Sequence, residues 1–274
     1  MKDAISFVVI AVTCSSLVLL GGQGNVLLAQ SSYKEIQVKD GGTIRGIVRL
    51  VGDASKAGTM EITKDDKICG RRKPSPRLTV GKNKGVQNAV VCLEEISQGK
   101  KTPGKEKFVL DQRKCEYVPH VMILPAGAQM EIVNSDPILH NVHAYDLTSE
   151  SRTAFNIAQP IKGQRTPIKT TQLKAPGLML ETCDAGHPWM SAYVIVADHP
   201  YYAVTDANGK FVLSDVPPGS YKLKMWHEGV VAVRTELEHE KPKKYYFEEP
   251  YEITKEVAVP PKGDVAVDFD LAPR

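Results

Sequence analysis

Apolar and polar side chains alternate along several stretches of the chain. Residues 44–50 carry apolar side chains or glycine at every second position with arginines between them, and residues 221–225 and 267–271 repeat the alternation with lysine or aspartate. Successive side chains of a strand point to opposite faces, so this period predicts strands with one solvated face. Turn sequences such as Asn208-Gly209 and Pro217-Pro218-Gly219 separate the stretches. We therefore predict an all-β protein built from β-sandwiches.

A long apolar run precedes these strands. Residues 4–20 are apolar except at Ser6 and between Thr13 and Ser16, and Ala29 supplies a small residue for cleavage. This arrangement is typical of a signal peptide, so we predict that residues 1–29 are removed and that the mature chain is secreted across the inner membrane, to be periplasmic or extracellular. The length of the run leaves an uncleaved membrane anchor as the alternative. In that case alone would a membrane be a partner.

The charge of the chain is nearly balanced. Its 35 Lys and Arg and 32 Asp and Glu give a formal net charge of +3. Surfaces that track phosphates are basic over a whole domain or stripe, so we expect no nucleic acid partner. One of the five cysteines, Cys14, lies in the predicted signal peptide. The other four enter a compartment in which disulfides persist.

Candidate metal chemistry is concentrated in two segments. His140 follows an apolar strand, and Cys183, His187 and Met190 lie within eight residues of one another further along the chain. Two imidazoles, one thiolate and a weak axial thioether are the ligands of a blue copper site. We therefore predict that these four residues hold one copper ion. Zinc, which a Cys-His-His set also accepts, and a metal-free sandwich with Cys183 buried or disulfide-bonded are the alternatives, and the thioether argues against zinc.

Residues 106–199 resemble the cupredoxins of the plastocyanin and amicyanin kind. The resemblance rests on the strand that leads through Asn134 to His140 and Asn141, and on the strand that leads to Cys183. It implies a Greek-key β-sandwich with a type 1 copper at one end, and it implies that Asn141 joins the two ligand loops by hydrogen bonds near the thiolate. The spacing departs from the family, because three residues separate Cys183 from His187 where two or four are usual. We interpret Gly186 as a one-residue extension, which leaves the geometry of the site open.

A second resemblance covers the flanking residues. Residues 203–213 and 216–223 resemble a carboxypeptidase-regulatory-like (prealbumin-type) sandwich, whose earlier strands would correspond to residues 42–50 and 86–93. The chain then divides into a first sandwich part at 40–96, the cupredoxin at 106–199 and a second part with a C-terminal arm at 200–274. An insertion of the cupredoxin into a split sandwich and a tandem arrangement are both open. The resemblance implies a structural or adhesive role for this module.

Other histidines allow a second metal site. Its candidates are His120, His143, His199 and His227. Such a site would convert an electron carrier into a copper-dependent oxidoreductase, but no pair among them has a strong local spacing. The alternative, which we prefer, is that they pack or form hydrogen bonds. The cupredoxin resemblance further implies an apolar lip at Pro188 and Trp189 through which electrons leave, with an ordinary packed tryptophan as the alternative.

Cysteine pairing follows if Cys183 binds copper. Cys69, Cys92 and Cys115 then remain, with three possible pairs. Cys92 lies in an apolar strand, where a free thiol packs as a small hydrophobic residue. A Cys69–Cys115 disulfide is therefore the preferred hypothesis.

These features together predict an exported blue copper protein that carries single electrons between redox partner proteins rather than an enzyme. A copper-dependent oxidoreductase with a second metal site is one alternative. An interaction module whose metal is structural or lost is the other.

Overall fold

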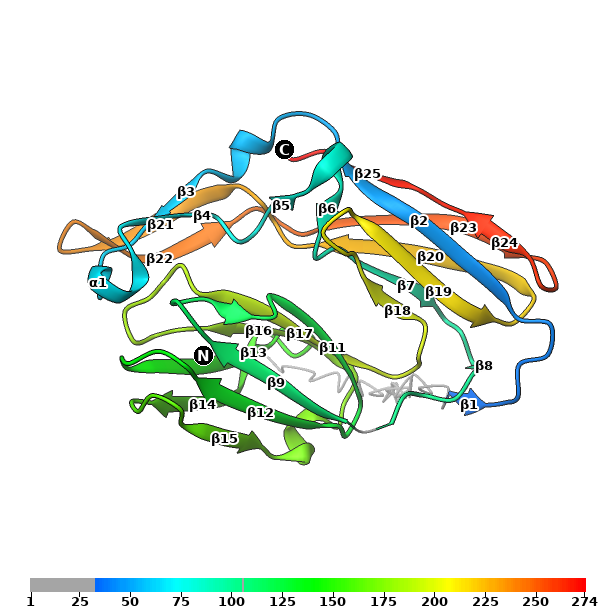
Figure 1. The fold of residues 1–274 in the computed structure, drawn as a ribbon, viewed down its shortest axis with the longest axis horizontal. Helices are drawn as coiled ribbons and strands as arrows, with labels where there is room; N and C mark the ends of the chain where they lie inside the picture. The colour runs from blue at the N-terminus through cyan, green and yellow to red at the C-terminus, as the bar shows by residue number, and fades with distance from the viewer. Residues whose placement is uncertain (1–32, 105) are drawn as a thin grey trace, which may run out of the picture. The chain divides into compact units, whose positions relative to one another are not determined.

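The computed structural model describes residues 33–104 and 106–274 (Figure 1). This part of the chain is nearly all β, which confirms the predicted fold class. Its single α-helix is the short α1 (Asp66–Cys69), and three 3-10 turns span Ala54–Ala57, Lys82–Lys84 and Thr170–Leu173. Within the described residues, no helix is long and apolar enough to cross a bilayer. The predicted signal peptide lies outside them.

Residues 107–197 form two sheets, drawn in green in Figure 1. The first sheet has the order β10-β9-β12-β15 and the second the order β11-β17-β16-β13-β14. Their strands are β9 (Lys107–Gln112), β10 (Tyr117–Val118), β11 (Val121–Pro125), β12 (Gln129–Asn134), β13 (His140–Asp146), β14 (Arg152–Gln159), β15 (Arg165–Ile168), β16 (Gly177–Thr182) and β17 (Ser191–Ala197). Parallel pairing of β9 with β12 and of β11 with β17 connects segments that are not neighbours in sequence.

One apolar core lies between these sheets. Leu110, Leu124, Ile132 and Val194 are among its fully buried members, each on a strand whose other face is less buried or packs elsewhere. Burial of such side chains contributes about 1.5–3 kcal/mol each, which makes the core the main stabiliser of this part. The core extends to the end of the sheets at which His140 and Cys183 lie.

Strands from both ends of the chain pair with each other in a further pair of sheets. One has the order β18-β7-β20-β23, and the other has the order β19-β2-β24 with β25 also on β2. Figure 1 accordingly draws the blue β2 between the yellow β19 and the red β24. Their bounds are β2 (Gly42–Leu50), β7 (Val90–Glu94), β18 (Tyr202–Val204), β19 (Lys210–Val216), β20 (Gly219–His227), β23 (Tyr251–Val259), β24 (Asp264–Ala266) and β25 (Phe269–Leu271).

Two of the three alternating stretches are strand throughout, and the third is strand in part. Residues 44–50 lie in β2 and residues 221–225 in β20, as the period of two predicts. The stretch at 267–271 is strand over Phe269–Leu271 only, and Val267, whose N–H donates to the carbonyl of Arg45, lies in the break between β24 and β25. A second core of buried residues, including Ile44, Leu223 and Phe269, holds these sheets together.

Shorter strand pairs complete the described part. They are β1 (Lys34–Glu35) with β8 (Gln98–Gly99), β3 (Thr59–Glu61) with β4 (Arg72–Pro74), β5 (Thr79–Val80) with β6 (Val86–Gln87), and β21 (Ala232–Glu238) with β22 (Lys241–Phe247). The pair β3–β4 matters most for the site, because α1 connects its two strands and Met60 of β3 belongs to the same core as Cys183.

Candidate metal centre

The predicted ligands lie at one end of the sheet β11-β17-β16-β13-β14. His140 is the first residue of β13, Cys183 directly follows β16, and His187 and Met190 lie on the loop that leads into β17. Antiparallel pairing aligns His143 of β13 with Thr182 of β16. This register places the start of β13 beside the end of β16, so two residues 43 positions apart become neighbours.

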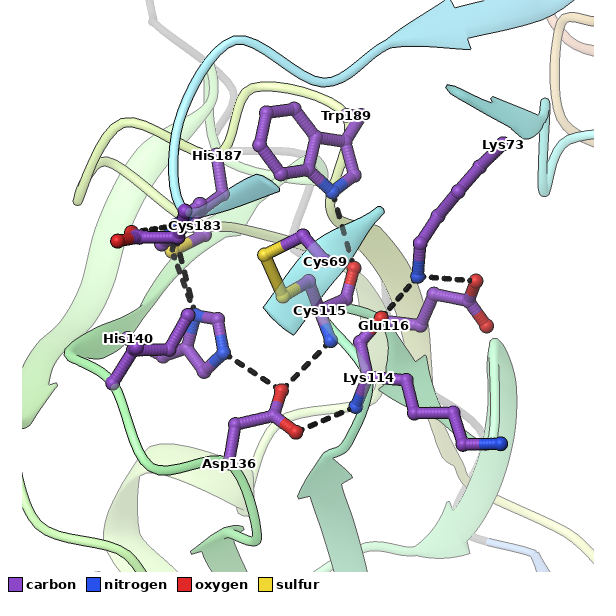
Figure 2. Close-up of a disulfide and its surroundings, with 12 residues drawn as sticks. Cys69, Lys73, Lys114, Cys115, Glu116, Asp136, His140, Cys183, His187 and Trp189 are labelled. Atoms are coloured by element: carbon purple, nitrogen blue, oxygen red, sulfur yellow. Dashed lines mark hydrogen bonds and ion pairs between the residues drawn. A yellow bond between two sulfur atoms is a disulfide. The ribbon is translucent and has the colours of Figure 1, made fainter. Parts of the chain in front are cut away.

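Three donor atoms converge in a buried space (Figure 2). The Nδ1 atoms of His140 and His187 are 3.2 Å apart. The Sγ atom of Cys183 lies 3.5 Å from Nδ1 of His187 and 4.0 Å from Nδ1 of His140. Both imidazoles have no exposed surface, and Cys183 is 3% exposed.

The outer nitrogen of each imidazole contacts a carboxylate. Nε2 of His140 lies 2.9 Å from Oδ2 of Asp136, and Nε2 of His187 lies 2.9 Å from Oδ2 of Asp65. An ionised carboxylate only accepts hydrogen bonds, so in each neutral ring the proton belongs on Nε2. Each Nδ1 then presents its lone pair to the other ring and to Cys183.

This arrangement fits a metal cation. Two lone pairs that face each other across 3.2 Å repel unless a proton or a cation lies between them. Bonds of about 2.0 Å to nitrogen and about 2.3 Å to sulfur, at about 120° to one another, would separate the two nitrogens by about 3.5 Å and each nitrogen from the sulfur by about 3.7 Å. The observed separations of 3.2, 3.5 and 4.0 Å lie around those values. Met190, the fourth predicted ligand, is 2% exposed and belongs to the same buried cluster as Cys183.

Burial sets the protonation of two of the donors. It raises the pKa of the Cys183 thiol, and the nearby charge of Asp184 adds to the rise. Burial likewise lowers the pKa of His187, although the hydrogen bond to Asp65 opposes the change. Without a metal, a neutral thiol and a neutral His187 are therefore the favoured forms. Of these two groups, only the thiol has a proton to lose before its donor atom can bind a cation.

Asn141 connects the two loops that carry the donors. Its Oδ1 accepts the N–H of Ala185 at 2.8 Å, and its Nδ2 donates to Asn156 at 2.9 Å. The loop also contains Gly186, whose φ of +92° lies in the region that favours glycine. Glycine is thus unstrained at this position between Cys183 and His187.

A disulfide lies beside this site (Figure 2). It joins Cys69 of α1 to Cys115, which is the pair that the sequence favoured, and Cys92 is free. The backbone N–H groups of Lys114 and Cys115 both donate to Asp136 at 2.7 Å. Burial alone would raise the pKa of Asp136, but the hydrogen bonds from His140, Cys115 and Lys114 lower it overall.

Trp189 is packed rather than presented at the surface. It is 3% exposed, lies edge-on to the His187 ring, and donates its indole N–H to the carbonyl of Cys115 at 3.1 Å. The expectation of an apolar lip at this residue is therefore wrong for Trp189, and the packed alternative holds. Its body fills the space between the His187 loop and the disulfide.

The four histidines considered for a second metal site each have local partners. His120 contacts Glu228, and Nδ1 of His227 lies 2.8 Å from the carbonyl of Glu228. His143 contacts Asp184 and Thr153, and His199 stacks on Tyr202. Among residues 33–104 and 106–274, neither cluster of three close metal-binding groups includes any of the four. The second metal site therefore remains a prediction that none of these clusters supports.

A cavity of about 780 Å³ opens next to the site. Cys183, Met190 and Trp189 line one side of it, and residues of β21 and β22, including Tyr245, line another. Cys183 and Met190 therefore border this cavity, whereas His140 and His187 are enclosed by protein.

Sequence reasoning missed the two aspartates. Asp136 lies four residues before His140, so its proximity was readable from the sequence, but nothing distinguished it from an ordinary turn residue. Asp65 is 122 positions from His187 and carries no sequence signal that points to the site.

No protein-family model and no curated protein matches the chain. Solved structures with a similar part include a purple cupredoxin from Nitrosopumilus maritimus (21% identity, TM-score 0.28, 33% of this chain and 98% of that chain). An amicyanin from Paracoccus versutus is 24% identical over 35% of this chain and 85% of its own, with a TM-score of 0.28. A copper-containing nitrite reductase from Thermus scotoductus is 21% identical over 36% of this chain, with a TM-score of 0.28, and the match spans 24% of that protein. These similarities cover about a third of the chain. They do not establish its function, which is argued below from the candidate site.

Proposed function

We propose that the chain is an exported type 1 copper protein that takes one electron from a reduced partner protein and gives it to an oxidised one. The observation that carries the proposal is the convergence of Nδ1 of His140, Nδ1 of His187 and Sγ of Cys183 within 4.0 Å of one another. Bound copper supplies a one-electron couple between Cu(II) and Cu(I).

The residues around the donors support this function over a zinc site. Thiolate and imidazole donors accept both metals, but a thioether is useful to a soft ion, and Met190 is buried in the same cluster. Enclosure of both imidazoles and their hydrogen bonds to aspartates resist rearrangement of the donors. A site that changes little between two oxidation states is suited to electron transfer.

We also propose that residues 106–199 are a cupredoxin module inserted between two parts of a carboxypeptidase-regulatory-like sandwich at 40–96 and 200–274. Pairing of β7 with β18 and β20, and of β2 with β19, supports the split arrangement. The role that follows for this sandwich is structural, since all four predicted ligands lie in the other module.

Optical and paramagnetic spectra of the purified chain loaded with Cu(II) test the copper proposal. The expected result is an intense visible thiolate-to-copper band that Cys183→Ser abolishes and Met190→Leu shifts. Cys92→Ser is the matched control, because Cys92 is the other free cysteine of the described chain and lies in β7. A wild-type chain without the band, or a band that survives Cys183→Ser, would refute the proposal.

A further inference from the structure

A segment outside the two sheets that carry the predicted ligands contributes to the centre. We define the strap as residues 59–74, which contain β3, α1 and β4. The strap contacts the ligand loop through Lys64, whose Nζ donates to the carbonyl of Ala185 at 2.6 Å, and through Asp65. Its α1 is joined to Cys115 by the disulfide. The strap is thus fastened both to the ligand loop and to Cys115.

The Asp65 side chain is directed at His187 rather than at its own helix. Asp65 occupies the N-cap position of α1, where an aspartate usually accepts a backbone N–H of the first turn. Here its side chain makes no capping hydrogen bond, and the backbone is in the left-handed region at φ 54°. Oδ2 instead accepts Nε2–H of His187 at 2.9 Å. The Asp65 carboxylate thus binds His187 instead of making the hydrogen bond that usually caps a helix.

The opposite end of the disulfide leads to the other imidazole. Cys115 donates its backbone N–H to Asp136, and Asp136 accepts Nε2–H of His140. One cysteine therefore lies on the helix that begins after Asp65, and its partner holds Asp136 directly. The two carboxylates that orient the two imidazoles are connected through a single covalent bond between sulfurs.

We propose that Asp65 and Asp136 are positioning residues of the metal centre, and that the Cys69–Cys115 disulfide keeps Asp65 against His187. The proposal rests on the proposed function, because positioning the two imidazoles matters only if they bind a metal ion. Each aspartate fixes one ring with its proton on Nε2 and its Nδ1 lone pair toward Cys183. Loss of such a carboxylate typically weakens metal binding by about 10–100-fold.

The metal-free chain provides the first test, because ring tautomers can be measured without a metal. Two-bond proton–nitrogen NMR correlations of the ¹⁵N-labelled chain at pH 7 should give a single Nε2–H tautomer for His187. Asp65→Ala should produce a mixture of tautomers at His187 and leave His140 unchanged, and Asp65→Asn, which keeps an accepting oxygen, should retain most of the preference. Asp66→Ala is the matched control, since that neighbouring carboxylate lies 3.9 Å from Arg71 instead.

Metal affinity provides the second test. With Cu(I) and a competing chromophoric chelator, Asp65→Ala should raise the dissociation constant about 10–100-fold, Asp65→Asn less, and Asp66→Ala not at all. If wild-type chain binds no Cu(I), the proposed function fails, while the tautomer measurement still decides the role of Asp65. A single Nε2–H tautomer that persists in Asp65→Ala overturns the positioning role whether or not copper binds.

The Cys69→Ser/Cys115→Ser double variant tests the disulfide. We expect a folded chain, judged by its amide spectrum, with the same tautomer mixture at His187 as Asp65→Ala. A folded double variant with His187 in one tautomer overturns the part assigned to the disulfide. A double variant that is unfolded throughout would show that the disulfide stabilises the whole fold. That result would likewise overturn its proposed role in holding Asp65 against His187.

Discussion

The Nδ1 atoms of His140 and His187 face each other at 3.2 Å while both Nε2 atoms are bound to aspartates. In a neutral pair of rings with this geometry, both inner nitrogens carry lone pairs. The Cys183 thiol is the nearby group that holds a proton, since burial raises its pKa. A bound cation would replace that proton and satisfy both rings together.

Metal binding should therefore release one proton from Cys183. Because burial raises the thiol pKa, the affinity for Cu(I) should increase about tenfold per pH unit between pH 7 and pH 8. Chelator competition at several pH values measures the slope. Cys183→Ser should bind weakly and lose the slope, whereas Cys92→Ser should keep both; an affinity that does not change with pH in the wild-type chain would contradict the assignment.

Glu181 should make the protein less stable as the pH rises. Burial raises its pKa to about 8, and neither carboxylate oxygen has a hydrogen-bond partner among the described residues. The unfolded chain ionises this group near its ordinary value, so between about pH 5 and pH 8 unfolding releases a proton and the free energy of unfolding falls by up to about 4 kcal/mol. Urea unfolding at pH 5, 6.5 and 8 measures the change.

A matched pair of variants isolates the contribution of Glu181. Glu181→Gln cannot ionise, so its loss of stability between pH 5 and pH 8 should be smaller than that of the wild type by most of this amount. Glu256→Gln, at an exposed position of β23, should follow the wild type. Equal pH dependence in all three chains would mean that Glu181 is already ionised in the folded protein.

The sequence predicts the strands better than their partners. Alternation identifies β2 and β20 because one face of each is solvated. It does not say that β2 pairs with β19, about 160 residues away, since sheet pairing depends on three-dimensional packing that a local period does not encode. The resemblance of residues 203–223 to a known sandwich, not the alternation, suggested that these distant segments belong to one sandwich, and it left a tandem arrangement open.

The candidate site divides in the same way. His140, Cys183, His187 and Met190 could be proposed from the sequence because residue types that bind copper cluster at recognisable spacing. Asp65 could not, because an aspartate before a four-residue helix has the appearance of an ordinary N-cap. Only the folded chain places its carboxylate against His187.

Removal of one partner of the Arg77–Glu228 ion pair should destabilise the protein strongly. Their Nη1 and Oε2 atoms are 2.7 Å apart, with side chains 7% and 3% exposed. Burial alone would raise the pKa of Glu228, but the charges of Arg77 and His120 lower it overall, so an ionised carboxylate is retained inside the protein. Arg77→Met would leave that charge without its main partner and should cost about 3–5 kcal/mol of unfolding free energy.

An exposed pair gives the comparison for Arg77. Lys243 and Glu238 lie 2.8 Å apart with about half of each side chain exposed, so Lys243→Met should lower the free energy of unfolding far less than Arg77→Met does. Denaturant unfolding at pH 7 measures both variants. Similar small losses for Arg77→Met and Lys243→Met would show that the buried carboxylate is easily neutralised or hydrated.

The split arrangement of the second sandwich predicts that the chain stays assembled after a cut between its first part and the cupredoxin. Strands β2 and β7 pair with β19, β18 and β20, and these pairings do not depend on an intact backbone at residues 102–104.

A protease recognition sequence inserted between Pro103 and Gly104 provides the cut. Reduction of the Cys69–Cys115 disulfide first removes the covalent link between the fragments. Size-exclusion chromatography should then show both fragments in one peak under native conditions and in two peaks in urea. Two native peaks would contradict the insertion, which depends on the pairing of β2 with β19 and of β7 with β18 and β20.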